Sequence, residues 1–221
     1  MLKDVLKNTR QQLEVHYKTQ NRVRDNNQFK INLAKGLGAA SALDTTFDLL
    51  SEAKQQKVLH PSISPDVRNG LLTTISNLQG QLREGYLGDS DVREIWTLSA
   101  TFKNEITAQW KMAATLKSEQ VTSSLCLLGR FLKDPAQAAA LVSKLDTGTQ
   151  GLPVSVSQIK AFTQAVVQGQ QMVDGAGFDD EIKTFLKKVT NNRATLTDIT
   201  PKVQGWIQKQ NLEGRIKVSF F

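Results

Sequence analysis

Apolar residues in this chain recur at intervals of three and four positions, and this spacing constrains the fold more than any other feature. One face of an α-helix collects residues at such intervals, whereas a half-buried strand needs an apolar residue at every second position. Strict two-residue alternation is nearly absent until the last few residues. The sequence therefore predicts an all-α fold, a multi-helix bundle with several long amphipathic helices.

Capping and breaking residues give the expected bounds of seven or eight helices. Ser64 followed by Pro65 is typical of a helix start, with the serine as the N-cap. The expected helices cover residues 2–24, 29–58, 65–85, 92–117 or beyond, 136–145, 155–173 and 182–189, with a last one from Pro201. Residues 215–220 alternate in polarity after Gly214 and could form a short C-terminal strand.

The stretch at residues 147–152 contains Gly148, Gly151 and polar side chains, which favour a loop. We therefore expect a larger helical domain over 1–146, with a basic N-terminal helix, and a smaller helical domain over 153–221. The two could also pack as one domain.

Positive charge is concentrated at the start of the chain. Residues 1–36 hold eight Lys/Arg and three acids, whereas the remaining residues carry 20 basic and 18 acidic groups. A localised positive field attracts phosphate or an acidic partner. Candidate partner- or phosphate-binding residues are Lys3, Lys7, Arg10, Lys18, Arg22 and Arg24.

An internal partner for this charge is also present. Asp44, Asp48 and Glu52 lie at i, i+4 and i+8 on one face of the second expected helix. The basic helix could therefore meet these acids or an external anion. Contact with nucleic acid would involve phosphates without reading base sequence, and the affinity would fall steeply with salt.

The apolar stripe beside the basic residues is thin. Leu6 and Leu13 fit a heptad, but Thr9, His16 and Gln20 interrupt it, so a long autonomous coiled coil is not expected. The chain has no uninterrupted apolar stretch long enough for a transmembrane helix, and the first residues lack the apolar segment of a secretory signal. We expect a cytoplasmic protein.

The residues give no recognisable catalytic, metal or cofactor set. Two histidines and one cysteine do not make a zinc site, and no Glu-x-x-His motif supports a di-iron bundle. Gly36 and Gly38 lie inside a helical pattern, which favours close packing over a nucleotide-binding loop. Cys126 lies in an apolar run and is expected to be a buried, unreactive core residue.

Two further clusters have alternative interpretations. Asp89, Asp91 and Glu94 are expected to cap a helix, although an enzyme of unrecognised type could use them. Residues 182–220 loosely resemble a helix-turn-helix outline, but the last helix offers few base-reading side chains, and a packed helical hairpin is favoured. Its exposed residues are expected to be Lys202, Gln204, Gln208 and Lys209.

Three functions remain open from the sequence. The first is a non-enzymatic helical adaptor or accessory subunit of a larger protein assembly, docking through amphipathic helices. The second is a nucleic-acid-associated module that contacts phosphates through the basic N-terminal helix. The third is an unrecognised enzyme. The sequence specifies neither the partner nor the oligomeric state.

Overall fold

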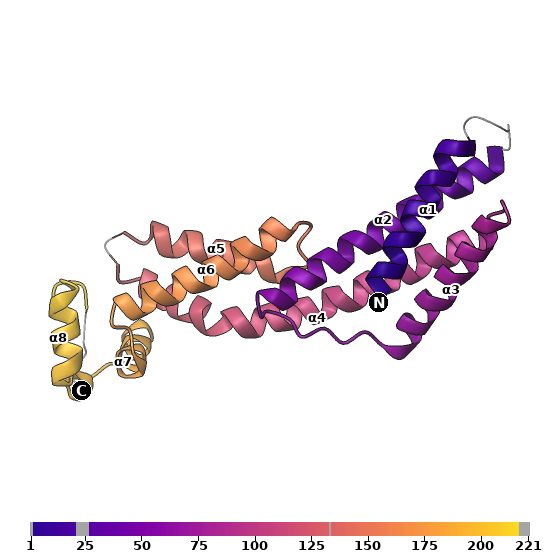
Figure 1. Ribbon diagram of the computed structural model, residues 1–221. Coiled ribbons are helices and arrows are strands. Elements are labelled where there is room, and N and C mark those ends of the chain that lie inside the picture. Colours follow the sequence, from indigo (N-terminus) through magenta and orange to yellow (C-terminus); the bar gives the residue numbers. More distant parts are fainter. Residues whose placement is uncertain (1, 21–26, 133, 217–221) are drawn as a thin grey trace. The chain divides into compact units, whose positions relative to one another are not determined.

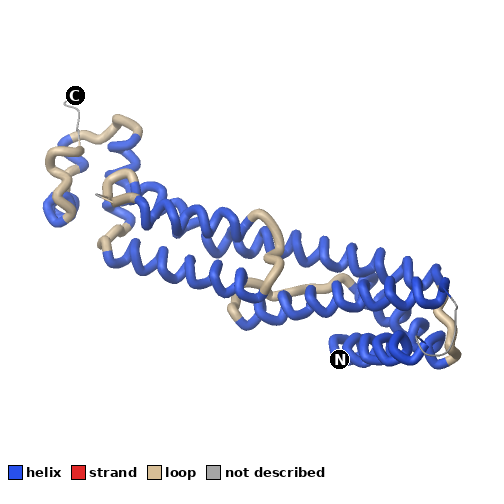
Figure 2. Tube along the Cα trace, turned by 90° about the horizontal axis from the view of Figure 1, so that it is seen from above, coloured by secondary structure: helices blue, strands red, loops and turns tan. Residues whose placement is uncertain are grey.

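The computed structural model describes residues 2–20, 27–132 and 134–216, without the side chains of Leu2, His16, Lys18, Thr19, Gln20 and Asn27. Over these ranges the chain forms eight α-helices, one short 3-10 helix and no strand (Figure 1; Figure 2). In chain order they are α1 (Leu2–Gln20), α2 (Asn27–Gln55), α3 (Pro65–Arg83), α4 (Asp89–Gly129), α5 (Ala136–Thr149), α6 (Val156–Gly175), α7 (Asp180–Thr190), η1 (Leu196–Asp198) and α8 (Pro201–Lys209). The predicted all-α bundle is confirmed.

The strand considered at residues 215–220 is not seen. The backbone N–H groups of Arg215 and Ile216 both donate to the carbonyl of Leu212, at 2.9 and 3.2 Å, and so close a turn. Residues 217–220 lie outside the described residues. Alternating polarity does not produce a strand unless a neighbouring strand accepts its hydrogen bonds, and no strand occurs in the described part of the chain.

By packing, the chain forms two compact units. Unit 1 comprises Met1–Lys111 and Leu152–Val156, and unit 2 comprises Met112–Gly151 and Ser157–Phe221. The division predicted at 147–152 stays a prediction. The loop itself begins later than expected, because α5 continues to Thr149.

Helix α4 belongs to both units. Its 41 residues extend for about 60 Å at the usual rise of an α-helix. The helix expected over 92–117 or beyond does continue past residue 117, through the apolar cluster that starts at Val121, and ends at Gly129. The same helix therefore supplies core residues to unit 1 and to unit 2.

In unit 1, α1 packs against α2 and α3. Leu6 and Leu13 are buried on this side of α1, with the buried Thr9 between them. The Thr9 hydroxyl accepts a hydrogen bond from Nε2 of Gln79 on α3, at 2.7 Å. Tyr17 is 40% exposed, so among the described side chains of α1 the apolar contact depends mainly on Leu6 and Leu13.

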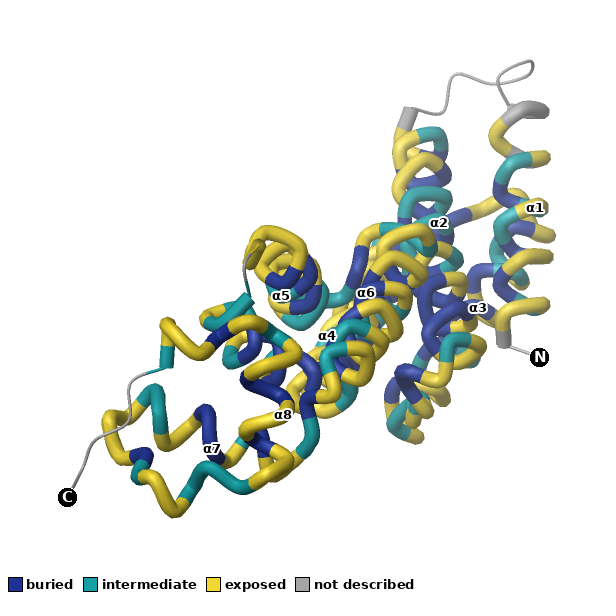
Figure 3. Tube along the Cα trace, turned by 90° about the vertical axis from the view of Figure 1, so that its left-hand side faces the viewer, coloured by how far each residue is buried: buried dark blue, intermediate teal, exposed yellow. Residues whose placement is uncertain are grey.

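The core of unit 1 lies between α2, α3 and the first part of α4. Buried positions recur along one side of each helix (Figure 3). The rings of Phe47 on α2 and Phe102 on α4 are 4.8 Å apart between centroids, a spacing that favours aromatic pairs. The other large buried side chains include Leu33, Leu43, Leu71, Ile75, Leu82, Ile106 and Trp110.

Two local predictions in unit 1 have different outcomes. Gly38 does permit close packing, because a Cβ there would lie 3.1 Å from the ring of Trp96. Ser64 precedes α3 as predicted, but its side chain does not cap the helix. Its backbone N–H and hydroxyl instead donate to the carboxylate of Glu105 on α4, at 2.8 and 3.2 Å. Ser64 is thus hydrogen-bonded to a charged acceptor on a neighbouring helix and not to the first N–H groups of α3.

Unit 2 contains a close helix contact at a glycine. Gly169 on α6 is buried against Val121 and Leu125 of α4. Ala138, Leu141 and other buried residues of α5 complete this part of the core. The absence of a side chain at Gly169 allows the two helices to approach.

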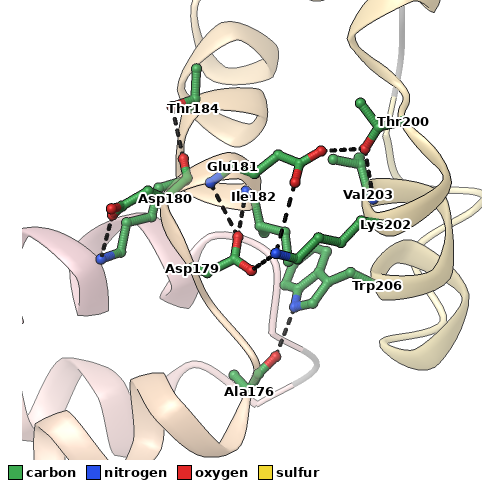
Figure 4. A network of polar contacts seen from close by, with 11 residues as sticks. Ala176, Asp179, Asp180, Glu181, Ile182, Thr184, Thr200, Lys202, Val203 and Trp206 are labelled. Carbon is green, nitrogen blue, oxygen red and sulfur yellow. Dashed lines mark hydrogen bonds and ion pairs between the residues drawn. The ribbon is translucent and has the colours of Figure 1, made fainter.

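The turn from α6 into α7 and α8 is held by a polar network (Figure 4). One carboxylate oxygen of Asp179 accepts from the backbone N–H groups of Glu181 and Ile182, both at 3.1 Å, and so caps α7. The other oxygen pairs with Nζ of Lys202 on α8, at 2.6 Å. Contact with Lys202 lowers the pKa of Asp179, and the same contact raises the pKa of Lys202.

Apolar contact and a second cap reinforce the same region. Val203, Trp206 and Ile207 of α8 are buried. Nε1 of Trp206 donates to the carbonyl of Ala176 at 2.7 Å. The carboxylate of Asp198 accepts from the ammonium of Lys188 and from the N–H and hydroxyl of Thr195. The packed arrangement expected for this segment is thus built from named contacts.

Replacing Gly169 by alanine should destabilise unit 2. The new Cβ would lie 2.6 Å from Cγ1 of Val121 and 3.0 Å from Cδ1 of Leu125. Overpacking costs about 1–3 kcal/mol, and the better helix propensity of alanine returns about 1 kcal/mol. We expect the free energy of unfolding, measured in urea, to fall by about 1 kcal/mol.

The matched control is Gly205→Ala on α8, where nothing lies within 4 Å of the added Cβ. This variant should be more stable than the wild type by up to about 1 kcal/mol. Equal stabilisation by both substitutions would contradict the close contact at Gly169.

Asp198 gives a pH-dependent prediction. The Lys188 ammonium and then the N–H and hydroxyl of Thr195 lower the pKa of Asp198 to about 2. Since the pKa in the unfolded chain is about 3.9, the carboxylate contributes stability above about pH 4 that is lost as pH falls through the folded pKa near 2. Asp198→Asn should lower the thermal unfolding midpoint at pH 7, and the difference from wild type should shrink toward pH 2.

The control for Asp198→Asn is Asp180→Asn, because the Asp180 side chain is 98% exposed and its ion pair with Lys183 is longer, at 3.5 Å. This variant should change the midpoint little. Carboxyl-carbon NMR measures the Asp198 pKa directly, and a midpoint near 4 would refute the contact.

Candidate functional site

The basic face of α1 meets acidic residues of α2 in unit 1. Nζ of Lys3 lies 2.5 Å from a carboxylate oxygen of Asp48. One terminal nitrogen of the Arg10 guanidinium lies 2.8 Å from Asp44, and Nε of Arg10 lies 3.2 Å from Glu14. Lys3 and Arg10 of α1 are thus each paired with a different acid of the neighbouring α2, Asp48 and Asp44 respectively.

These contacts balance the positive charge on the basic face of α1. A hollow of about 430 Å³ is lined by Lys3, Lys7, Arg10, Gln11, Glu14, Asp44 and Asp48, so its three cations face three carboxylates. The hydrogen bond to Asp48 raises the pKa of Lys3, which keeps the ammonium protonated. Within this hollow the carboxylates balance the cations, so the acids of α2 are partners of the basic face, one of the two alternatives that the sequence left open.

The remaining predicted residues of this face are not part of the ion pairs with Asp44 and Asp48. Lys7 is exposed and lines the same hollow. Lys18 lies in α1, but its side chain is not described, and Arg22 and Arg24 lie outside the described residues. Glu52, the third acid of the α2 face, is buried and accepts from Nε2 of Gln56 at 2.8 Å.

The acids at the start of α4 are held by neighbouring side chains. Asp89 pairs with Arg93 on the next turn and, at 3.4 Å, with Lys35 of α2. The Arg93 contact is the main cause of the lowered pKa of Asp89. Asp91 accepts from Nε2 of Gln81 at 2.6 Å, and Glu94 is exposed. These partners are all side chains and none is a backbone N–H of α4, so the capping interpretation of Asp89 and Asp91 stays a prediction.

The structure contains a second basic region that the sequence analysis missed. Residues 182–221 hold eight Lys/Arg and two acids, and the acid excess of residues 37–181, 16 acids against 12 bases, hides this in the overall count. A charge count over short windows would have found it. Within it, Lys183, Lys188 and Lys202 form ion pairs, whereas the Lys187 side chain is exposed.

Lys187 borders a small cleft between α7 and the end of α4. The residues that line it are Ser123, Cys126, Leu127, Arg130, Lys187, Thr190 and Asn191, and its volume is about 230 Å³. None of these residues is acidic, in contrast to the hollow on α1. This cleft therefore keeps an excess of positive charge.

The prediction that Cys126 is a buried core residue was wrong, because its side chain is exposed. Successive residues of a helix turn by about 100°, so a run of four apolar residues covers the full circle and cannot be buried throughout. Leu125 and Leu128 take the buried positions. Cys126 faces outward, where it lines the α4–α7 cleft and also a larger groove between α4 and α5.

The described residues contain neither a cluster of metal-ligating side chains nor a membrane-spanning helix. Within residues 2–20, 27–132 and 134–216, no group of three or more His, Cys, Asp or Glu side chains could hold a metal ion. Over the same ranges, no helix combines the length and apolarity needed to cross a membrane.

Comparison of the chain with protein-family models, with curated proteins and with solved structures gives no match. The functional interpretation therefore depends on the residues and contacts described above.

The pairing of α1 with α2 predicts that removing the acids will expose cationic charge. In the double variant Asp44→Asn and Asp48→Asn, Lys3 and Arg10 lose their carboxylate partners on α2. Binding to a polyanion such as heparin should then strengthen and persist to higher salt. The slope of log affinity against log salt concentration should steepen by about one for each freed side chain.

Asp66→Asn with Asp134→Asn has the same change in net charge and serves as the control, since both side chains are exposed and neither lines the α1 hollow. The elution salt of each variant from heparin measures the effect. Equal shifts in the two double variants would mean that net charge alone is responsible.

Proposed function

We propose that this protein is a non-enzymatic helical adaptor or accessory subunit that docks through the outward face of α4 in unit 2. The observation that carries the proposal is a pair of large apolar side chains one turn apart on that face. Met112 is 69% exposed and Leu116 is 71% exposed. Residues at i and i+4 lie side by side on a helix and can enter one groove of a partner.

The energetics favour these two residues as anchors. Burying one such side chain contributes about 1.5–3 kcal/mol, so the pair could account for a substantial part of a protein–protein affinity. Other exposed apolar residues, such as Val167 and Leu196, stand singly on their helices, which is normal for a protein surface.

The position in α4 also supports docking. A helix surface whose opposite side is fixed in a core is preorganised, which lowers the entropic cost of binding. Ala114 and Ser118, on the inward side of the same turns, are buried. We infer that the partner presents the apolar stripe of an amphipathic helix.

Nucleic-acid association through the basic N-terminal helix is the alternative. It would have to draw Lys3 and Arg10 away from Asp48 and Asp44, which lowers the gain from each phosphate contact. An enzymatic function through Asp89, Asp91 and Glu94 has less support, because Asp89 and Asp91 already have side-chain partners at the start of α4.

The adaptor proposal predicts that Met112→Glu with Leu116→Glu removes a bound partner. Both side chains are exposed, so folding should persist, whereas two carboxylates cannot enter an apolar groove without a large desolvation cost. Affinity for a protein that co-purifies with the native chain should fall at least about tenfold, measured by calorimetry with that purified protein.

Val167→Glu on α6 is the matched control, because it places a charge at another exposed apolar position, which is 50% exposed. Retention of the partner by the double variant would reject the α4 face as the docking surface. If no protein co-purifies with the wild-type chain, the adaptor function itself is wrong.

A further inference from the structure

The α4–α7 cleft of unit 2, about 230 Å³ in volume, is lined by several residues whose side chains carry hydrogen-bond donors. The guanidinium of Arg130 and the ammonium of Lys187 carry charge, and the Ser123 hydroxyl and Asn191 amide add neutral donors. The Thr190 hydroxyl already donates to the carbonyl of Leu186 at 2.9 Å. The lining thus combines two cations and two neutral donors with no carboxylate.

The cations of the cleft are not required to cap α7. At the C-terminal end of that helix, backbone N–H groups of residues 191–193 donate to the carbonyls of Lys187, Val189 and Lys188, at 2.8–3.1 Å. Lys188, the next residue, is the one that pairs with Asp198. Among the described residues, neither Arg130 nor Lys187 forms an ion pair with a carboxylate.

Charge-assisted hydrogen bonds are the strongest contacts available to such groups, and arginine matches the geometry of a phosphoryl group in a bidentate fashion. The negative end of the α7 dipole opposes an anion, but its effect is smaller than that of two full charges. The cleft is small and local, which suits a single phosphoryl group better than the extended backbone of a nucleic acid.

We propose that the α4–α7 cleft binds a phosphate monoester, with Arg130 and Lys187 contacting the phosphoryl oxygens and Ser123 and Asn191 completing the set of donors. The proposal is independent of docking through Met112 and Leu116, which lie on another part of α4.

Cys126 provides the test, because it is the single cysteine of the chain and lines the cleft. Its alkylation by iodoacetamide, a neutral reagent, is followed at constant ionic strength with added chloride, inorganic phosphate or phosphoserine. Phosphate and phosphoserine should slow the reaction several-fold at saturation, and chloride should not. Line broadening of the ³¹P signal of phosphoserine gives a second readout that does not depend on the thiol.

Arg130→Gln and Lys187→Gln should each weaken phosphoserine binding at least tenfold, judged within each variant by the ratio of rates with and without ligand. This ratio cancels any effect of the lost charge on the thiol itself. Lys209→Gln, on the exposed side of α8, is the matched control and should bind as the wild type does.

Three results would overturn the assignment. One is the absence of both slowing and ³¹P broadening in the wild-type chain. A second is binding that survives both glutamine variants unchanged. The third is protection by a short oligonucleotide without protection by phosphoserine, which would assign the cleft to nucleic acid instead of a monoester.

Discussion

Helix α4 is the element on which both compact units depend. Phe102, Ile106 and Trp110 are buried in unit 1, and Val121 and Leu125 are buried in unit 2. Both sets of side chains belong to one continuous helix. Local unfolding of α4 near residue 111 would therefore displace core side chains of unit 1 and of unit 2. A continuous helix also fixes which side chains turn outward, so the exposure of Met112 and Leu116 follows from the burial of Ala114 and Ser118.

The sequence allowed the helices to be predicted, because three-and-four spacing is a local property that tertiary packing uses directly. Prediction from the sequence was less reliable wherever a distant residue competed with a local one for the same hydrogen-bonding group. Ser64 has the sequence pattern of an N-cap, yet its hydroxyl donates a hydrogen bond to Glu105, which is 41 positions away. The alternation near Arg215 has the signal of a strand, but a strand needs a partner that local sequence cannot supply.

The candidate site was predicted only in part, because the sequence shows which residues share a helix face but not which helices are neighbours. A basic face on the first helix and an acidic face on the second suggested internal pairing, and the structure pairs Lys3 with Asp48 and Arg10 with Asp44. The spacing could not decide between internal acids and external anions, because that choice depends on which helices become neighbours. The wrong prediction for Cys126 has a related cause, because an apolar run does not reveal which of its residues faces solvent.

Net charge is therefore a poor guide to where an anion binds, and the composition of each lining is a better one. The α1 hollow contains three cations but also three carboxylates within the same lining, so an incoming anion must compete with groups that are already fixed nearby. The α4–α7 cleft has only two cations, yet its lining holds no acid. A cation that is already paired with a carboxylate has less to offer an incoming anion. The surface with fewer cations but no acid is therefore the better anion site.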